Sequence, residues 1–170
     1  MKTRLLLREN GWKECEELIW YKPDSPPMGS IQRPRRAWES VLWFSRTNKP
    51  KCYPKANGKT SSRIGFEQSK FEEGNDSYVH KGQNEASNGI ARCNDVIIAG
   101  ASKVEKGYNH PAMFPPEVPE CLIKLLTDEG DLVVDPFMGS GTTGRVCRNL
   151  NRRWIGFEIN KEYERVKEIE

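Results

Sequence analysis

The sequence predicts an α/β fold, and its clearest part is a parallel strand–helix–strand unit near the C-terminus. A short apolar run at 131–135 is followed by a turn with glycines at 139 and 141, and then by a predicted helix over 142–149. A second strand is predicted over 153–158, with a final helix from Lys161. Strands that alternate with helices in this order pack as a parallel sheet covered by helices. The 170 residues are enough for one domain with a buried core.

Three regions follow one another along the chain, with predicted boundaries at 1–47, 48–109 and 110–170. In the first, the end of a helix is predicted over Arg4–Asn10 and strands over 17–22 and 38–45, with a proline-rich loop between the strands. The second is rich in Lys, Asn, Gly, Ser and Glu, which is typical of a polar insert, and only 95–99 has the pattern of a strand. The third opens with an amphipathic helix over 116–126 and continues into the unit described above.

Composition excludes several classes of protein. The chain has no apolar run of eighteen residues, so no transmembrane helix is expected, and Leu5–Leu7 is too short for the core of a signal peptide. The five cysteines are widely spaced without a Cys-x-x-Cys pair, and there are two histidines. This pattern argues against a metal site and favours reduced thiols in a cytoplasmic protein.

The basic charge is concentrated in the first third of the chain. Residues 1–60 carry 13 Lys and Arg against 6 Asp and Glu, whereas residues 111–170 carry 8 against 11. Such a gradient is compatible with a surface that meets a polyanion, most commonly a nucleic acid. Ordinary solvated surface charge would produce the same counts.

The glycine-rich turn and the acid that follows it indicate a nucleoside pocket. Gly139 and Gly141 allow a ligand to approach the backbone, and the helix that follows presents free N–H groups. Glu158 ends the next strand, where a carboxylate can accept hydrogen bonds from both hydroxyls of a ribose. Gly144 completes a G-x-G-x-x-G spacing, so a nicotinamide-dependent oxidoreductase is one alternative and a plain tight turn is another. A Walker loop is excluded, because no Gly-Lys-Ser/Thr follows.

The run Asp-Pro-Phe-Met-Gly-Ser-Gly-Thr-Thr at 135–143 resembles the S-adenosylmethionine loop of the DNA amino-methyltransferases, which act on adenine N6 or cytosine N4. The segments at 110–115 and 154–160 resemble those that flank this loop in the family, and 19–23 and 33–39 resemble segments further upstream. Their order is similar to that of the permuted β group, in which the catalytic half precedes the cofactor half. The resemblance implies a Rossmann-like methyltransferase sheet, incomplete at the N-terminus, of which this chain is the C-terminal, cofactor-binding part.

The resemblance also implies roles for individual residues. S-adenosylmethionine would be held at its methionine end by the loop, at its ribose by Glu158, and on its adenine side by Phe114 and Pro115. The loop residues in question are Asp135, Phe137, Gly139, Ser140, Gly141, Thr142 and Thr143. The basic side chains on the proline-stiffened loop beside Trp38 would bind phosphates of double-stranded DNA; they are Lys22, Arg33, Arg35 and Arg36. The polar stretch 48–106 occupies the position of the family's target-recognition insert.

The catalytic tetrapeptide of that family, a polar residue followed by Pro-Pro and an aromatic residue, has no counterpart before Trp20. The nearest match, Ser25-Pro26-Pro27, ends in Met28 and equally suits a connecting loop. We therefore expect a chain whose catalytic portion is absent or lies on a second polypeptide, with Met1 an internal or secondary start. Two functions stay open: an S-adenosylmethionine-dependent DNA methyltransferase, and a non-catalytic cofactor- or DNA-binding subunit that completes an enzyme in trans.

Overall fold

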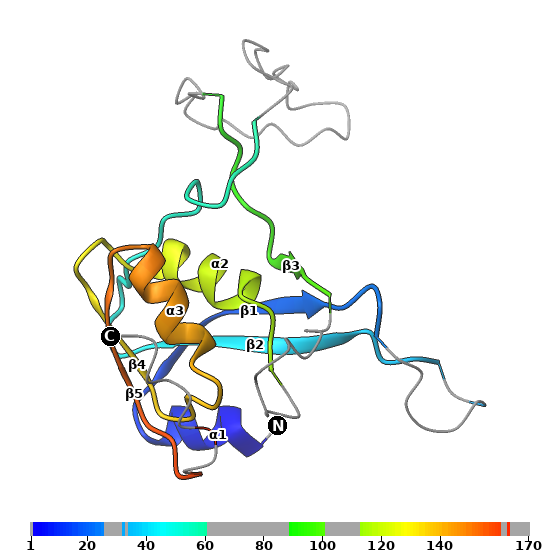
Figure 1. The fold of residues 1–170 in the computed structure, drawn as a ribbon, viewed down its shortest axis with the longest axis horizontal. Coiled ribbons are helices and arrows are strands. Elements are labelled where there is room, and N and C mark those ends of the chain that lie inside the picture. Colours follow the sequence, from blue (N-terminus) through cyan, green and yellow to red (C-terminus); the bar gives the residue numbers. More distant parts are fainter. Residues whose placement is uncertain are drawn as a thin grey trace, which may run out of the picture. The chain divides into compact units, whose positions relative to one another are not determined.

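The computed structural model describes residues 2–25, 32, 34–60, 89–100, 113–160 and 163 (Figure 1). The chain divides into two compact units, one made of Met1–Tyr53 with Asn94–Glu170 and the other of Pro54–Cys93. Some of the sequence-based predictions fall on residues that the structure does not describe: Pro26, Pro27, Arg33, the segment 110–112 and the helix from Lys161. Of that predicted helix, only Tyr163 is described.

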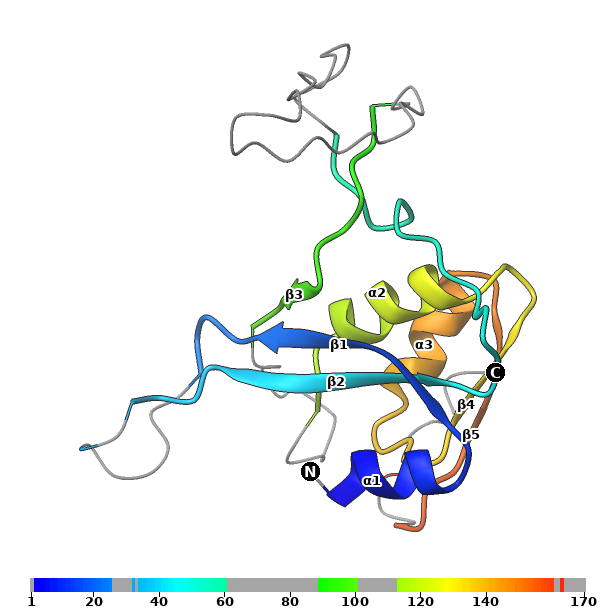
Figure 2. The ribbon, with the colours of Figure 1, turned by 180° about the vertical axis from the view of Figure 1, so that it is seen from behind.

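A three-stranded sheet forms one part of the larger unit. β1 (Lys13–Tyr21) lies between β2 (Trp38–Ser45), which is antiparallel to it, and β3 (Val96–Ile98), which is parallel. Figure 2 shows β1 and β2 side by side. They pair from Lys13 opposite Ser45 to Tyr21 opposite Trp38, with a register shift between Glu14 and Glu16. The buried Trp20 fastens the end of β1, because its indole N–H donates to the carbonyl of Ala99 at 2.9 Å.

The predicted strand–helix–strand unit forms the other part and confirms the α/β class. β4 (Leu132–Asp135) and β5 (Arg153–Gly156) pair in parallel and are connected through α3 (Thr142–Asn149). α2 (Glu117–Leu126) packs against α3. Their shared core is made of Ile123, Val133, Val146, Cys147, Leu150 and Trp154. Burial raises the pKa of the Cys147 thiol, which therefore stays protonated at neutral pH.

The N-terminal elements are longer than the sequence pattern predicts. α1 spans Lys2–Glu9, and β1 begins at Lys13 instead of residue 17. The charged residues at 13–16 have little strand propensity of their own, but β2 supplies their ladder partners. Arg4 adds ion pairs from α1 to Glu14 at 3.3 Å and to Glu17 at 2.5 Å.

A polar cluster holds the segment before the smaller unit against the turn between α2 and β4. Lys51 Nζ lies 2.7 Å from Asp128 Oδ2 and 2.9 Å from Asp131 Oδ2, and the N–H of Tyr53 donates to the carbonyl of Leu125 at 2.7 Å. The paired carboxylates raise the pKa of Lys51 above its usual range. Among the described residues, no helix is long and apolar enough to span a membrane, and no cluster of His, Cys, Asp and Glu could bind a metal ion.

The described part of the smaller unit is a pair of antiparallel segments, 54–60 and 89–93, which we call the stem. Thr60 pairs with Ile90, the N–H of Ala91 donates to the carbonyl of Lys59 at 3.0 Å, and that of Cys93 donates to the carbonyl of Pro54 at 2.7 Å. The sequence of these two segments has no alternation of apolar and polar residues, which is the pattern that would predict a strand.

Candidate functional site: the glycine loop after β4

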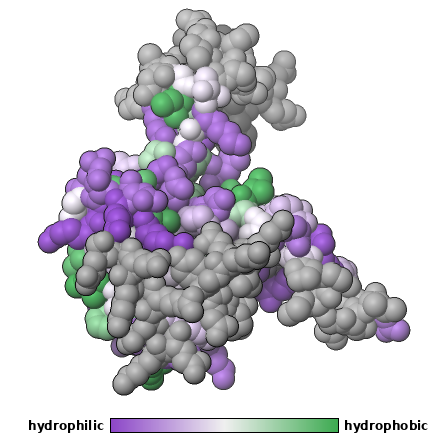
Figure 3. All heavy atoms as spheres, in the orientation of Figure 1, coloured by the Kyte–Doolittle hydropathy of each residue, from purple (hydrophilic) through white to green (hydrophobic). Residues whose placement is uncertain are grey.

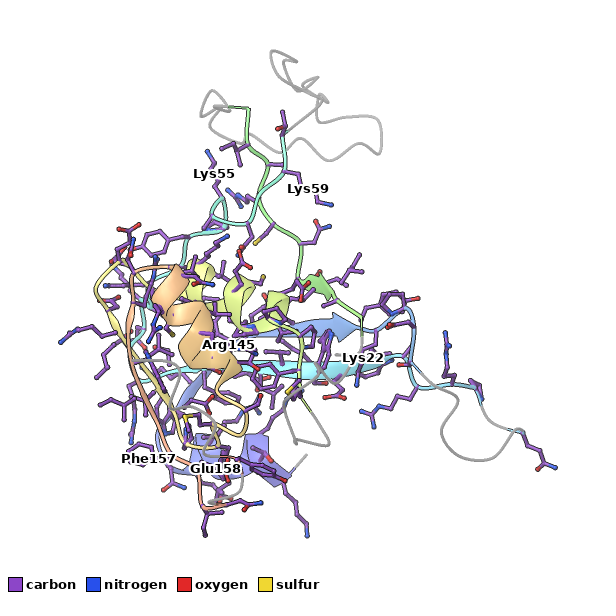
Figure 4. All side chains as sticks on the ribbon, viewed as in Figure 1. Lys22, Lys55, Lys59, Arg145, Phe157 and Glu158 are labelled. Atoms are coloured by element: carbon purple, nitrogen blue, oxygen red, sulfur yellow. The ribbon has the colours of Figure 1, made fainter. Side chains whose placement is uncertain are left out.

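β4 and β5 end at the same edge of their parallel pair, and the segments that follow them are in contact. Asp135 lies opposite Gly156 at the ends of β4 and β5. Beyond this pair, the N–H of Phe157 donates to the carbonyl of Asp135, and the N–H of Met138 donates to the carbonyl of Phe157, both at 2.9 Å. The segment 136–141, which we call the glycine loop, is thus fastened to the residues after β5, two of which are labelled in Figure 4.

The glycine loop turns sharply because its residue types permit it. The Asp135 carboxylate accepts the N–H of Phe137 at 3.0 Å, which closes the first turn. Gly139 and Gly141 have φ angles of 54° and 77°, in the left-handed region that side chains with a β-carbon disfavour. Gly141 directly precedes α3, so the first turn of that helix follows at once.

Glu158 lies directly against the loop. Its Oε2 accepts the N–H of Gly139 at 2.7 Å, and its Oε1 accepts the N–H of Asn160 at 2.8 Å. The two features that the sequence singled out, 19 residues apart, are therefore in contact.

The start of α3 carries buried hydroxyls and a cation. Ser140 and Thr142 are buried, and their hydroxyl oxygens lie 3.2 Å apart. Thr143 is half-buried beside them. A guanidinium nitrogen of Arg145, labelled in Figure 4, lies 3.5 Å from Thr142 Oγ1. Arg145 is not among the residues predicted from the sequence, although a cation one turn into a helix that begins at a glycine loop was an available signal.

The third glycine of the G-x-G-x-x-G spacing has a packing function. A β-carbon at Gly144 would lie 2.8–2.9 Å from three carbons of the Trp154 ring, so the absence of a side chain lets α3 approach β5. Met138 is a second packing residue that the sequence analysis missed. Its sulfur would lie 2.4 Å from a β-carbon at Gly156, so it packs against the end of β5 and helps to hold the loop.

Phe114 and Pro115, the residues expected on the adenine side, precede α2. Phe114 is half-buried and Pro115 is buried, with the carbonyl of Pro115 accepting the N–H of Val118 at 3.1 Å. α2 in turn packs against α3, the helix that starts at the glycine loop. Their contact with an adenine ring stays a prediction.

The residues expected to bind DNA lie at the end of the β1–β2 pair, where Figure 4 labels Lys22. Lys22 forms an ion pair with Glu39 and lies 4.5 Å from the centre of the Trp20 ring. Arg36 stacks over the ring of Trp38, which is 44% exposed. A stacked guanidinium keeps its in-plane N–H groups, so Arg36 can still donate to a phosphate.

Arg35 contacts the described residues at the start of the proline-rich loop. Its guanidinium donates to the carbonyl of Ser25 at 2.7 Å and to that of Pro23 at 3.2 Å. Ser25, the weak catalytic candidate, is buried, and its N–H donates to the carbonyl of Lys22 at 3.3 Å. The binding of phosphates by this group and a catalytic role for Ser25 stay predictions.

Comparison with known proteins gives one family and several relatives. A family model described as DNA methylase, of the N6/N4 type, matches residues 2–168. The type II methyltransferase M.XycI of Xanthomonas campestris pv. cyanopsidis is 31% identical over 157 residues, which are 92% of this chain and 44% of that protein. M.PvuII of Proteus hauseri is 31% identical over 196 residues, covering 94% and 55%. The chain thus spans about half the length of the curated relatives it matches.

Solved structures resemble the chain over nearly its whole length. The cytosine-N4-specific PvuII DNA methyltransferase has a TM-score of 0.67 at 27% identity and covers 95% of this chain, which spans 53% of that structure. The complex of M1.HpyAVI with S-adenosylmethionine has a TM-score of 0.61 at 27% identity, with coverages of 96% and 65%. The predicted Rossmann-like methyltransferase fold is confirmed by these structures.

Proposed function

This chain belongs to the DNA methylase family of the N6/N4 type, and on that premise we propose that it forms the cofactor-binding half of an S-adenosylmethionine-dependent methyltransferase. Its substrate is the exocyclic amine of adenine or cytosine in double-stranded DNA. The observation that carries the proposal is the contact between Glu158 and the N–H of Gly139 at 2.7 Å, which joins loop and acid at the ends of two parallel strands. Such a position is where nucleoside cofactors bind in α/β sheets.

The residues present suit this cofactor. The Glu158 carboxylate just beyond the end of β5 suits a ribose, because a carboxylate at this place in an α/β sheet accepts hydrogen bonds from ribose hydroxyls. Asp135 and Glu158 place two carboxylates at the loop, and negative charge there favours a cationic ligand. When bound, S-adenosylmethionine supplies an electrophilic methyl group on its sulfonium. The chain's own residues bind and orient it, and the absence of β-carbons at Gly139 and Gly141 lets the ligand approach the backbone there.

The proposal also covers the acceptor. The curated relatives are named type II methyltransferases, and the similar solved structure of PvuII is named a DNA methyltransferase. The basic first third of this chain suits a polyanion. In one form of the proposal, this chain acts in trans with a partner polypeptide that carries the catalytic tetrapeptide. Adding such a polypeptide to the chain and measuring methyl transfer to DNA distinguishes it from activity of the chain alone.

The cofactor site is tested by calorimetry with S-adenosylhomocysteine on the wild-type chain and on E158Q. Glutamine keeps the shape but turns one acceptor into a donor that faces a backbone N–H. We expect an affinity loss of at least tenfold, since hydrogen bonds to a charged group contribute about 1.5–3 kcal/mol each. E129Q, at an exposed turn residue before β4, is the matched control and should bind normally.

A 2′-deoxy analogue of S-adenosylhomocysteine separates a direct ribose contact from an effect on loop structure. If Glu158 accepts the ribose hydroxyl, the analogue binds the wild-type chain more weakly than the parent compound, and E158Q reduces or removes that difference. Equal losses for both compounds on E158Q would mean that Glu158 only supports the loop. Unchanged affinity of E158Q for the parent compound would remove Glu158 from the site.

A further inference from the structure

We infer that Arg145 binds the α-carboxylate at the methionine end of the cofactor and so selects a ligand with an intact amino-acid group. The inference rests on the proposed function and deepens it, because it takes S-adenosylmethionine as the ligand of the glycine loop. It adds a binding residue on α3, where Figure 4 labels it.

The methionine end of S-adenosylmethionine carries charges of both signs. Its sulfonium and α-ammonium groups are cations, whereas its α-carboxylate is an anion at neutral pH. The acids already placed at the site, Asp135 and Glu158, favour the cations but repel the carboxylate. The carboxylate therefore needs donors of its own, and a guanidinium suits it well because its planar fork can donate two parallel hydrogen bonds.

The arginines of the segment 132–160 lie at different ends of its elements. The segment has four arginines and no lysine. Arg148 lies in the last turn of α3. Arg152 and Arg153 lie at the start of β5, where each donates to a carbonyl of the turn between α2 and β4 at 2.9 Å. Of the four, Arg145 alone lies at the end of α3 that follows the glycine loop.

The side chain of Arg145 is directed back toward the glycine loop. Long side chains on an α-helix lie over the residues three and four positions earlier, toward the N-terminus of the helix. A guanidinium nitrogen of Arg145 accordingly lies 3.5 Å from Oγ1 of Thr142, and its backbone N–H donates to the carbonyl of Gly141 at 3.1 Å. Thr142 is buried and Arg145 is half-buried, so the cation is held close to the start of α3.

Charges of opposite sign therefore follow one another along the site. The carboxylates of Asp135 and Glu158 accept N–H groups within the loop, those of Phe137 and Gly139. The guanidinium of Arg145 lies beyond the loop, beside the first residue of α3. This order matches a ligand whose cationic groups and carboxylate are separate, and it assigns the carboxylate to the α3 end.

The test is calorimetry on the full chain with two ligands that differ only in the carboxylate, S-adenosylhomocysteine and its decarboxylated analogue. The wild-type chain should bind S-adenosylhomocysteine more tightly. R145Q should weaken that ligand by about tenfold or more and leave the affinity for the analogue unchanged, so that the preference disappears. R145K, which keeps the charge without the planar fork, should restore part of the preference.

R148Q is the matched control, because it removes the same charge from the last turn of the same helix. Arg148 is exposed, and the surface around the C-terminal end of α3 is mainly hydrophilic in the view of Figure 3. R148Q should bind both ligands as the wild type does. Retained affinity of R145Q for the decarboxylated analogue shows that this variant is folded.

A second measurement needs no variant and decides the question if R145Q does not fold. Phenylglyoxal modifies accessible guanidinium groups, and mass spectrometry locates the modified residues. At equal saturation, S-adenosylhomocysteine should protect Arg145 more than the decarboxylated analogue does, and neither should protect Arg148. Equal modification of Arg145 in the two complexes overturns the inference.

Failure of the inference and failure of the proposed function give different results. A wild-type chain that binds both ligands equally, or an R145Q variant that keeps the wild-type preference, overturns the role of Arg145 and leaves the cofactor site intact. Equal losses for both ligands in R145Q also overturn it, since Arg145 would then only support the loop. A wild-type chain that binds neither ligand overturns the proposed cofactor site as well.

Discussion

Replacing Gly144 by alanine opposes two effects of known size and so tests how α3 packs on β5. In the interior of an exposed helix, alanine is more stable than glycine by about 1 kcal/mol. Here the new methyl group would lie 2.8 Å from the Trp154 ring, and the helix and ring would have to separate by about 0.6 Å to reach the 3.4 Å of ordinary contact. The sign of the measured change therefore reports whether the ring is free to move.

The surroundings of Trp154 indicate that it is not free. The ring packs against the core of Ile123, Val146 and Cys147, and Cys147 is fully buried. Overpacking of such a core costs about 1–3 kcal/mol. The helix propensity gain of about 1 kcal/mol offsets part of this overpacking cost. We therefore expect G144A to lower the free energy of unfolding by up to about 2 kcal/mol.

The assay is urea unfolding of the full chain followed by far-UV circular dichroism, which does not depend on the Trp154 fluorescence. W154L and the double variant G144A/W154L complete a double-mutant cycle. Alanine at position 144 should cost less, or become stabilising, once the indole is gone. A G144A variant that is about 1 kcal/mol more stable than the wild type would refute the close packing of helix and ring.

Two further predictions concern other parts of the larger unit. The pKa of Asp128 is lowered mainly by Lys51 and then by Tyr53, and the pKa of Asp131 is lowered by the N–H of Asp128 and then by Lys51. Both carboxylates therefore stabilise the fold at pH values above their ordinary pKa of about 3.9. They lose this effect as the pH falls through their lowered pKa values in the folded protein. The double variant D128N/D131N should therefore show a smaller fall in melting temperature between pH 5 and 3 than the wild type, and an unchanged fall would contradict the network. W20F leaves the carbonyl of Ala99 without its indole donor and should cost about 1–3 kcal/mol in urea unfolding. W38F, at an exposed position, should cost less than about 0.5 kcal/mol, and equal costs would mean that the Trp20 hydrogen bond contributes nothing.

The parts of the site that lie close together in the chain follow from the sequence. A short apolar run, a glycine turn, a helix and a second apolar run must form two parallel strands that end at one edge. The contact between Glu158 and the glycine loop is a consequence of that connectivity, because both segments follow those strand ends. The bounds of β2 and α3 agree with their predicted ranges for a similar reason, since local residue preference and periodicity specify them.

Only the tertiary structure decides which residues from distant parts of the chain contact one another. Gly144 serves the packing of Trp154, Lys22 is bound by Glu39, and Gly58 makes room for the backbone at Ala91. Sequence patterns describe the neighbours of a residue along one strand or one helical turn, whereas these contacts form only when separate elements pack. Loop and acid were therefore recognisable from the sequence, but the pairing of Lys22 with Glu39 and of Lys51 with two aspartates required the fold.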